Sequence, residues 1–248
     1  MPSELGSILG VIPARLGSTR LPRKVLREIA GQPMLVWVYR AARACPQFDN
    51  VLVATDSQEV IDFAQGHGIP AVFTPEDCAS GTDRVHAVAQ SIPADIYVNI
   101  QGDEPLLTPE HFPPLLKLFS RPEVQVATLA VRCPARDISN PNAVKVVNAD
   151  DGRALYFSRA TIPFDRDNIG FTGYRKHLGI YAYRKAALAQ FASLPPSWLE
   201  SLERLEQLRL LDNGIDIYVA PAPADTIGVD TEEDLKAAEA ILAARSRA

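Results

Sequence analysis

The chain of 248 residues has few cysteines, and the three that it has are isolated from one another. Cys45, Cys78 and Cys133 are odd in number and lack the spacing of metal ligands, and no His/Cys cluster indicates zinc. We expect reduced thiols, mostly in the core, of a cytoplasmic protein. No apolar run approaches the roughly 18 residues of a membrane span, and no secretory signal opens the sequence. A membrane partner is therefore not expected.

A basic surplus is also missing. The formal net charge of −5 argues against a nucleic-acid partner, because such proteins usually carry excess positive charge. Hydrophobic residues make up 47% of the chain and charged residues 22%, which is typical of a globular protein with a substantial core. Repeats, low-complexity tracts and interdomain linkers are absent from the sequence, so we expect a single domain over residues 1–248.

Both familiar phosphate-loop motifs are missing, since the chain has neither Gly-x-x-x-x-Gly-Lys-Ser/Thr nor Gly-x-Gly-x-x-Gly. Residues 10–24 nevertheless follow an apolar run at 8–12 and combine small residues with cations. The small residues are Gly17, Ser18 and Thr19, and the cations are Arg15, Arg20, Arg23 and Lys24. Backbone N–H groups and hydroxyls in such a loop can hold phosphate oxygens while the cations offset their charge. A phosphate-binding loop and an ordinary solvated connection both remain open at this point.

The order of the segments predicts an α/β fold. Strands at 8–12, 51–55 and 69–73 alternate with helices, which is typical of a parallel series with helical crossovers. After about residue 124 this rhythm fails, and strands at 143–148, 155–159 and 176–183 predict a smaller antiparallel block. The last segments predict a helix at 199–213, strands at 215–220 and 226–230, and a final helix through 244.

Two aspartates follow predicted strands that are far apart in sequence. Asp103 comes after the strand at 95–100, at the kind of strand end where ligands of open α/β sheets bind. If Asp103 and Asp230 converge, they could hold Mg²⁺ against a triphosphate. Structural roles compete with this reading, because Asp103 also suits a turn and Asp230 adjoins a capping box formed by Thr231 and Asp234. Ser80, before another predicted helix, is expected first as a cap and second as a ligand contact.

The antiparallel block carries charged and aromatic residues that suit either a lid over an acidic substrate or a dimer surface. These two roles are compatible, and the residue types do not separate them. The residues are Lys145, Tyr156, Arg159, Arg166, Arg175, His177, Tyr181 and Tyr183. No Ser-His-Asp arrangement follows from the spacing.

Nine segments resemble the 3-deoxy-manno-octulosonate cytidylyltransferases, or CMP-Kdo synthetases, in order along nearly the whole chain. They are residues 12–24 (IPARLGSTRLPRK), 54–56 (ATD), 80–84 (SGTDR), 99–105 (NIQGDEP), 140–145 (NPNAVK), 154–163 (ALYFSRATIP), 177–181 (HLGIY), 205–209 (LEQLR) and 228–231 (GVDT). The resemblance implies a mostly parallel, Rossmann-like nucleotidyltransferase sheet flanked by helices. The antiparallel excursion, about residues 133–190, would serve substrate binding and dimerisation. Arg23 departs from the family, which carries Gly there.

The resemblance also implies a reaction. CMP would pass from CTP to the anomeric hydroxyl of 3-deoxy-D-manno-octulosonate (Kdo), releasing pyrophosphate, in the lipopolysaccharide pathway of a Gram-negative cytoplasm. Mg²⁺ beside Asp103 would lower the pKa of the sugar hydroxyl for in-line attack on the α-phosphorus. The expected partners are CTP, Kdo and a second copy of the chain. Two alternatives remain open: the same chemistry on 8-amino-Kdo or another sugar acid, and a nucleotide-sugar-binding domain without catalysis.

Family roles carry over onto matching residues. The expected catalytic residues are Arg15, Lys24, Asp103 and Asp230, of which Asp103 and Asp230 would bind Mg²⁺. Arg15, Ser18 and Lys24 would contact the triphosphate, and Ser80 and Gly81 the cytidine. The sugar-acid pocket would be lined by Gln101, Arg159, Arg166, His177, Tyr181, Glu206 and Gln207.

Overall fold

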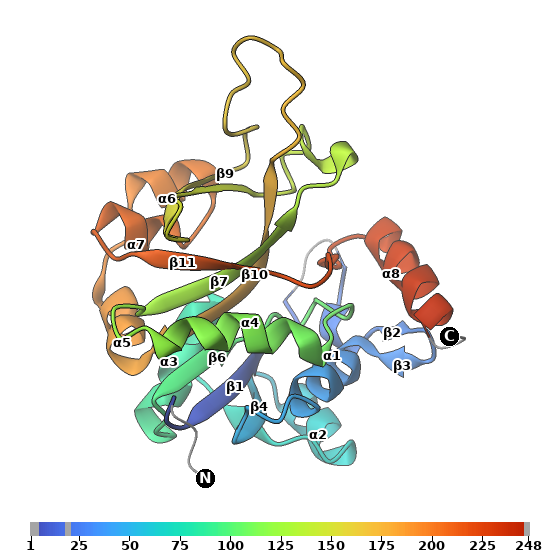
Figure 1. Ribbon diagram of the computed structural model, residues 1–248. Helices are drawn as coiled ribbons and strands as arrows, with labels where there is room; N and C mark the ends of the chain where they lie inside the picture. Colours follow the sequence, from blue (N-terminus) through green and yellow to red (C-terminus); the bar gives the residue numbers. More distant parts are fainter. Residues whose placement is uncertain (1–4, 18–20, 246–248) are drawn as a thin grey trace. The chain divides into compact units, whose positions relative to one another are not determined.

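The computed structural model describes residues 5–17 and 21–245 (Figure 1). The chain divides into two compact units. Unit 1 contains the described residues up to Pro113 together with those from Thr226 onward, and unit 2 runs from Pro114 to Asp225. Within the described residues, no helix combines the length and the apolar character needed to span a membrane.

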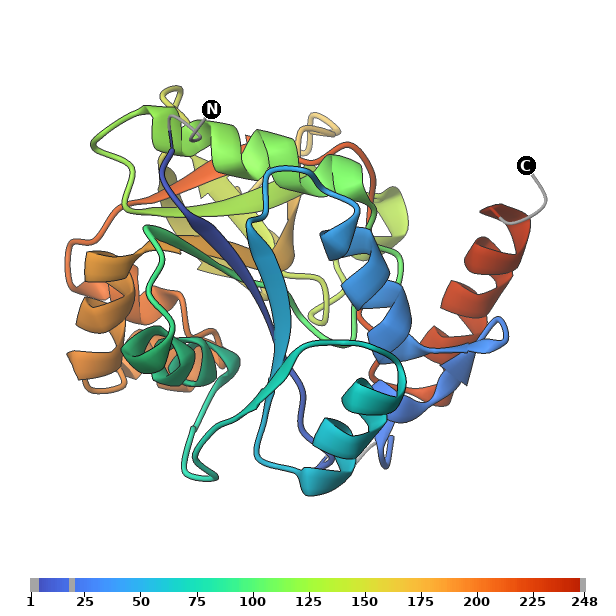
Figure 2. The same ribbon diagram turned by 90° about the horizontal axis from the view of Figure 1, so that it is seen from below.

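Unit 1 is built on a parallel sheet in the order β6–β1–β4–β5. Its strands are β1 Ile8–Pro13, β4 Asn50–Thr55, β5 Ala71–Phe73 and β6 Ile96–Asn99. The intervening helices are α1 Met34–Arg43, α2 Gln58–Gly66 and α3 Gly81–Ser91. Figure 2 shows α3 on one face of this sheet and α1 with α2 on the other. Strands buried on both faces read as continuous apolar runs, which is why the sequence predicted this parallel series correctly.

A hairpin between β1 and α1 escaped sequence prediction. Strands β2 Glu28–Ile29 and β3 Gln32–Pro33 are joined by Ala30 and Gly31, with φ of 49° and 75°. Two consecutive positive φ values characterise the tight turn that matches the twist of paired strands. Helix α8 Glu232–Arg245 contacts the hairpin (Figure 2) and buries an apolar cluster with it. The cluster comprises Leu21, Ile29, Met34, Leu106, Val229, Leu235, Ala238 and Leu242.

Unit 2 contains the expected antiparallel block. Strand β7 Val126–Arg132 pairs in antiparallel fashion with β10 Arg175–Arg184 and in parallel with β11 Ile217–Pro221. Strands β8 Lys145–Asn148 and β9 Ala154–Ser158 continue the antiparallel pairing beyond β10. The loop at 159–174, gold in Figure 1, extends away from the strands of its own unit.

Short helices complete both units. They are η1 Lys24–Leu26, η2 Pro109–His111, α4 Phe112–Lys117, η3 Leu118–Ser120, η4 Ala135–Asp137, α5 Lys185–Ser193, α6 Trp198–Glu203 and α7 Leu208–Asp212. Helix α5 was not predicted, although its Ala-rich sequence favours helix.

Two sequence predictions near the end of the chain are wrong. The helix expected at 199–213 is divided into α6 and α7, because Arg204 adopts a left-handed conformation with φ of 54° and ends α6. The main-chain N–H of Leu205 then bonds back to Glu200 O, which is typical of a left-handed helix end. The strand expected at 226–230 is a loop, anchored by a bond from Val229 N to Asp103 O.

Candidate active site

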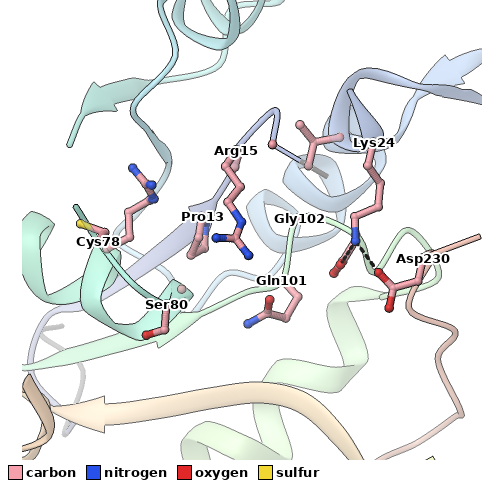
Figure 3. A pocket seen from close by; sticks show the side chains of 14 residues that line it. Pro13, Arg15, Lys24, Cys78, Ser80, Gln101, Gly102 and Asp230 are labelled. Atoms are coloured by element: carbon pink, nitrogen blue, oxygen red, sulfur yellow. Dashed lines mark hydrogen bonds and ion pairs between the residues drawn. The ribbon is translucent and has the colours of Figure 1, made fainter. Parts of the chain in front are cut away.

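Lys24 joins the two aspartates that the sequence places far apart. Its ammonium donates to Asp103 Oδ2 at 2.5 Å and to Asp230 Oδ1 at 2.8 Å (Figure 3). All three residues belong to unit 1. The convergence of Asp103 and Asp230 on which the magnesium hypothesis depends therefore occurs, and it occurs around a cation supplied by the chain itself.

The main chain fixes both carboxylates. Asp103 follows β6, and the adjoining Gly102 lies so close to β1 that an added Cβ would be 3.0 Å from Pro13 O. The N–H of Val229 bonds to Asp103 O at 2.9 Å, which ties the two aspartate loops together. Asp230 N donates to Asp234 Oδ2 at 3.1 Å, at the start of α8. The capping box expected from Thr231 and Asp234 is present, so capping and placement of the Asp230 carboxylate occur together.

The charges of the two aspartates hold Lys24 protonated. Burial of the ammonium lowers the pKa of Lys24, but its attraction to Asp103 and Asp230 and its hydrogen bonds to both outweigh that effect. The net result is a pKa above the ordinary lysine value. One positive charge against two negative charges leaves the group of three with a formal charge of −1.

A cavity of about 260 Å³ lies beside this group. Arg15, Gly17, Ser80, Gly81, Gln101 and Cys78 are among the residues that line it. Figure 3 shows the Arg15 guanidinium directed into the cavity, and Arg15 makes no ion pair with any described residue. Predicted nucleotide-binding residues Arg15, Lys24, Ser80 and Gly81 thus share one cavity, whereas Ser18 lies outside the described residues.

The start of α3 forms one wall of the cavity. Ser80 caps this helix: its Oγ accepts from Asp83 N at 3.1 Å and donates to Asp83 Oδ2 at 2.9 Å. The preference for a cap is confirmed for the Ser80 hydroxyl. The N-terminus of a helix of this length also presents a partial positive charge to an anion.

Sequence reasoning missed two residues of the cavity wall, Arg84 and Cys78. Arg84 is buried on α3 and pairs with Asp56 at 2.6 Å. Asp56 therefore serves this ion pair, and Ser57 occupies the N-cap of α2 without a side-chain bond. The spacing of Arg84 along α3 could have indicated an inward-facing position, but its partner on another segment could not be read from sequence.

A second set of predicted residues meets in unit 2. The His177 ring contacts Tyr181 with centroids 5.2 Å apart and Phe157 at 5.1 Å. Desolvation lowers the pKa of His177 to about 3, so the imidazole is neutral near pH 7. Thr128 Oγ1 donates to Ile180 O at 2.7 Å and lies 2.9 Å from His177 Nε2. This network places the imidazole proton on Nε2 and leaves Nδ1 as an acceptor.

The Tyr181 hydroxyl is buried without a hydrogen-bond partner among the residues that the structure describes. Desolvation raises the pKa of Tyr181 well above its ordinary value, and the charges of Tyr183 and Glu206 add to the shift. An unpaired buried hydroxyl costs about 1–3 kcal/mol. Such a group indicates a place where a ligand can complete the hydrogen bond.

The other predicted sugar-pocket residues have different surroundings. Arg159 donates to the main-chain oxygens of Glu203 at 2.8 Å and Pro141 at 3.0 Å. Arg166 is exposed on the loop at 159–174. Gln207 is buried beside Glu206 in the connection between α6 and α7, and Gln101 lines the cavity of unit 1.

Lys145 does not contribute to a surface or lid. It is completely buried, and its ammonium donates to the carbonyls of Asn140, Ala143 and Arg159. Burial lowers the pKa of Lys145. Lys145, on β8, therefore stabilises the surrounding main chain.

A family model described as cytidylyltransferase matches residues 9–217. A 3-deoxy-manno-octulosonate cytidylyltransferase of Acidobacterium capsulatum is 73% identical over 241 residues, covering 97% of this chain and 98% of the relative. The protein of the same name from Koribacter versatilis is 58% identical over 245 residues, with coverage of 98% and 94%.

A solved structure also matches. It is that of CMP:2-keto-3-deoxy-manno-octonic acid synthetase complexed with CTP, which is 43% identical to this chain. The match covers 96% of this chain and 99% of the other, with a TM-score of 0.91.

Proposed function

Because the chain belongs to the cytidylyltransferase family, as a member of its 3-deoxy-manno-octulosonate group, we propose that it transfers CMP from CTP to Kdo. The anomeric hydroxyl oxygen of Kdo forms a bond to the α-phosphorus as the bond from that phosphorus to the bridging oxygen breaks. Pyrophosphate departs with the bond electrons, and the hydroxyl proton passes to solvent. The observation that carries this proposal is the Lys24–Asp103–Asp230 group beside a cavity into which the Arg15 guanidinium points, in a chain closely similar to enzymes of this name.

The cationic side of the cavity suits the triphosphate. Arg15 makes no ion pair with the described residues, so its guanidinium can bind phosphate oxygens without breaking an ion pair with any of them. Lys24 adds a second positive charge. The start of α3, at Gly81, adds the partial positive charge of a helix N-terminus without a charged side chain. These groups position the triphosphate and stabilise the charge that develops on the departing pyrophosphate.

The donor chemistry of Asp103 and Asp230 fits Mg²⁺. Hard divalent cations prefer carboxylate oxygen, and Mg²⁺ is usually held by one or two carboxylates together with phosphate oxygens and water. The two carboxylates already converge on one cationic atom, and no cluster of three or more acidic, His or Cys side chains suited to a metal occurs in the described part of the chain. When bound, such an ion supplies positive charge to the triphosphate and lowers the pKa of a neighbouring hydroxyl.

Unit 2 provides groups suited to a sugar acid. The unpaired hydroxyl of Tyr181 and the acceptor Nδ1 of His177 suit sugar hydroxyls, which both donate and accept hydrogen bonds. Because His177 is neutral, it cannot neutralise the sugar carboxylate. We assign that task to the cations Arg159 and Arg166, with Glu206 and Gln207 as further polar contacts of unit 2.

We also propose a homodimer in the cytoplasm that produces activated Kdo for lipopolysaccharide. The loop at 159–174 exposes Phe164 and Ile169 at 83% and 79%, and such exposed apolar side chains are typical of protein interfaces. Analytical ultracentrifugation of the wild type and of Phe164→Ser tests the assembly. A dimer weakened by the substitution supports it, and a monomeric wild type contradicts it.

The decisive experiment measures pyrophosphate release by the purified protein. Four nucleoside triphosphates are combined with Kdo, 8-amino-Kdo and N-acetylneuraminate, with Mg²⁺ present. We expect the highest kcat/KM for CTP with Kdo. A preference for another sugar would correct the substrate, and absence of turnover with every pair would refute an enzymatic role.

A further inference from the structure

The Lys24 ammonium lies where a metal held by Asp103 and Asp230 would have to bind. It contacts one oxygen of each carboxylate, at 2.5 and 2.8 Å. A divalent ion sharing the same two oxygens would meet an ammonium at short distance, and like charges there repel strongly. The metal and the ammonium therefore exclude each other from the space between the two carboxylates.

The three groups differ in how freely they can move. Asp103 and Asp230 lie in loops joined by the Val229–Asp103 main-chain bond, and Asp230 is further fixed at the start of α8. Lys24 reaches them through a flexible four-carbon side chain. Its side chain is only 13% exposed, against 27% and 43% for the carboxylates, so the carboxylates are more accessible to solvent than the lysine. Displacement of the ammonium thus requires movement of the Lys24 side chain alone, while the carboxylates stay in place.

We propose that Lys24 is an internal counter-cation that keeps the divalent-metal site closed until a nucleoside triphosphate attracts its ammonium away. The inference rests on the proposed function and concerns the order of binding at the same site. A triphosphate in the adjoining cavity offers Lys24 several negatively charged oxygens. When the ammonium moves to them, the two carboxylates become available to the metal. The phosphate oxygens also supply the ligands that two carboxylates alone lack.

This exchange couples the two ligands. Metal binds weakly to the nucleotide-free protein and tightly once nucleotide is present. Linkage requires the metal to strengthen nucleotide binding by the same factor. The consequence for function is that the carboxylates do not hold metal without the phosphates on which it is to act.

Direct metal titration of the nucleotide-free protein tests the proposal, with Mn²⁺ as the probe and free Mn²⁺ measured by electron paramagnetic resonance. Lys24→Met removes the charge and keeps a side chain of similar length. We expect it to bind Mn²⁺ at least about 10-fold more tightly than the wild type, since its carboxylates are unshielded. Lys24→Arg retains the charge and should keep Mn²⁺ binding weak. Asp103→Asn combined with Lys24→Met should abolish the gain.

A second readout uses thermal stability without substrates. Mn²⁺ should raise the Tm of Lys24→Met by more than it raises that of the wild type, because the stabilisation by a ligand at free concentration L, RT ln(1 + L/Kd), grows as its Kd for the folded state falls. Equal Mn²⁺ affinity in the wild type and Lys24→Met, with both proteins folded, would overturn the proposal. Wild-type turnover of CTP with Kdo is measured separately, so failure of the proposed function is distinguishable from failure of the metal exchange.

Discussion

Removal of the Tyr181 hydroxyl should stabilise the protein and weaken its substrate binding at the same time. The hydroxyl is buried and has no hydrogen-bond partner among the described residues. Tyr181→Phe keeps the ring, with its contacts to His177 and Tyr183, and removes only the unpaired oxygen. A hydroxyl retained at a cost in the free protein is expected to be useful when ligand is bound.

Tyr181→Phe should change both the free energy of unfolding and the KM for Kdo. A buried polar group without a partner costs about 1–3 kcal/mol, so its removal should raise the free energy of unfolding by about 1 kcal/mol. For a chain of this size that corresponds to a rise in Tm of about 2–4 °C. Loss of one hydrogen bond to the sugar should raise the KM for Kdo about 10-fold, while the KM for CTP stays close to that of the wild type.

Tyr97 offers a matched control in unit 1. Its hydroxyl is also buried, but it donates to Ile92 O at 2.9 Å and accepts from Ala94 N at 2.7 Å. Tyr97→Phe makes the same chemical change and leaves two main-chain groups without their partner. It should therefore lower the free energy of unfolding by about 1–3 kcal/mol and leave the KM for Kdo unchanged.

Urea and thermal unfolding, together with steady-state pyrophosphate release at varied Kdo, measure both effects. The reasoning is refuted if Tyr181→Phe loses as much stability as Tyr97→Phe and keeps the wild-type KM for Kdo. That result would mean that the Tyr181 hydroxyl has a protein partner in solution and no role in sugar binding.

Three further predictions concern other residues. Asp103→Asn should reduce kcat for pyrophosphate release at least about 100-fold with Mg²⁺ present, and a kcat within 10-fold of wild type would contradict the metal assignment. His177 should lower the free energy of unfolding as the pH falls from about 6.5 towards 3, because the unfolded state binds the proton that the desolvated imidazole resists. The free energy of unfolding should fall by at most about 1.4 kcal/mol per pH unit from this residue. Urea unfolding of His177→Gln should show a weaker dependence of that free energy on pH. Arg23, with φ of 56°, forms an ion pair with Glu59, so both Arg23→Gly and Arg23→Ala lose the pair. Gly tolerates the left-handed backbone and Ala does not, so thermal unfolding should show Arg23→Gly to be about 1 kcal/mol more stable than Arg23→Ala.

Much of the fold could be predicted because burial imposes a pattern on sequence. The strands of unit 1 are apolar runs, and the alternation of strands with helices predicted their parallel pairing. Failures occurred where backbone geometry at single residues decides the outcome. Arg204 in the left-handed region divides a continuous helical pattern, and nothing in that residue type predicts such a conformation.

The site could be predicted in part for a related reason. Asp103 follows the buried strand β6, Asp230 lies in the loop before α8, and the convergence that the metal hypothesis required occurs. The position of the Lys24 ammonium could not be predicted, because a flexible side chain could equally have faced the phosphate cavity or solvent. Cys78 and Arg84 were missed because membership of a cavity wall depends on tertiary packing. The spacing of Arg84 along α3 indicates an inward-facing position but not the cavity that it lines.

Cations that look equivalent in the sequence differ in whether their hydrogen-bond donors are already bonded to the protein. Lys145 and Arg159 both belong to segments that match the family, yet the three bonds of Lys145 and most of those of Arg159 go to main-chain carbonyls. Arg15 makes no ion pair with the described residues, and its guanidinium faces a cavity. A cation whose donors are already bound must break protein contacts before it binds a ligand, whereas a free cation loses only water. Substitution of Arg15 should therefore weaken CTP binding by more than substitution of Arg159 weakens Kdo binding. Substitution of Arg159 should also lower the free energy of unfolding, because its bonds to main-chain carbonyls are lost.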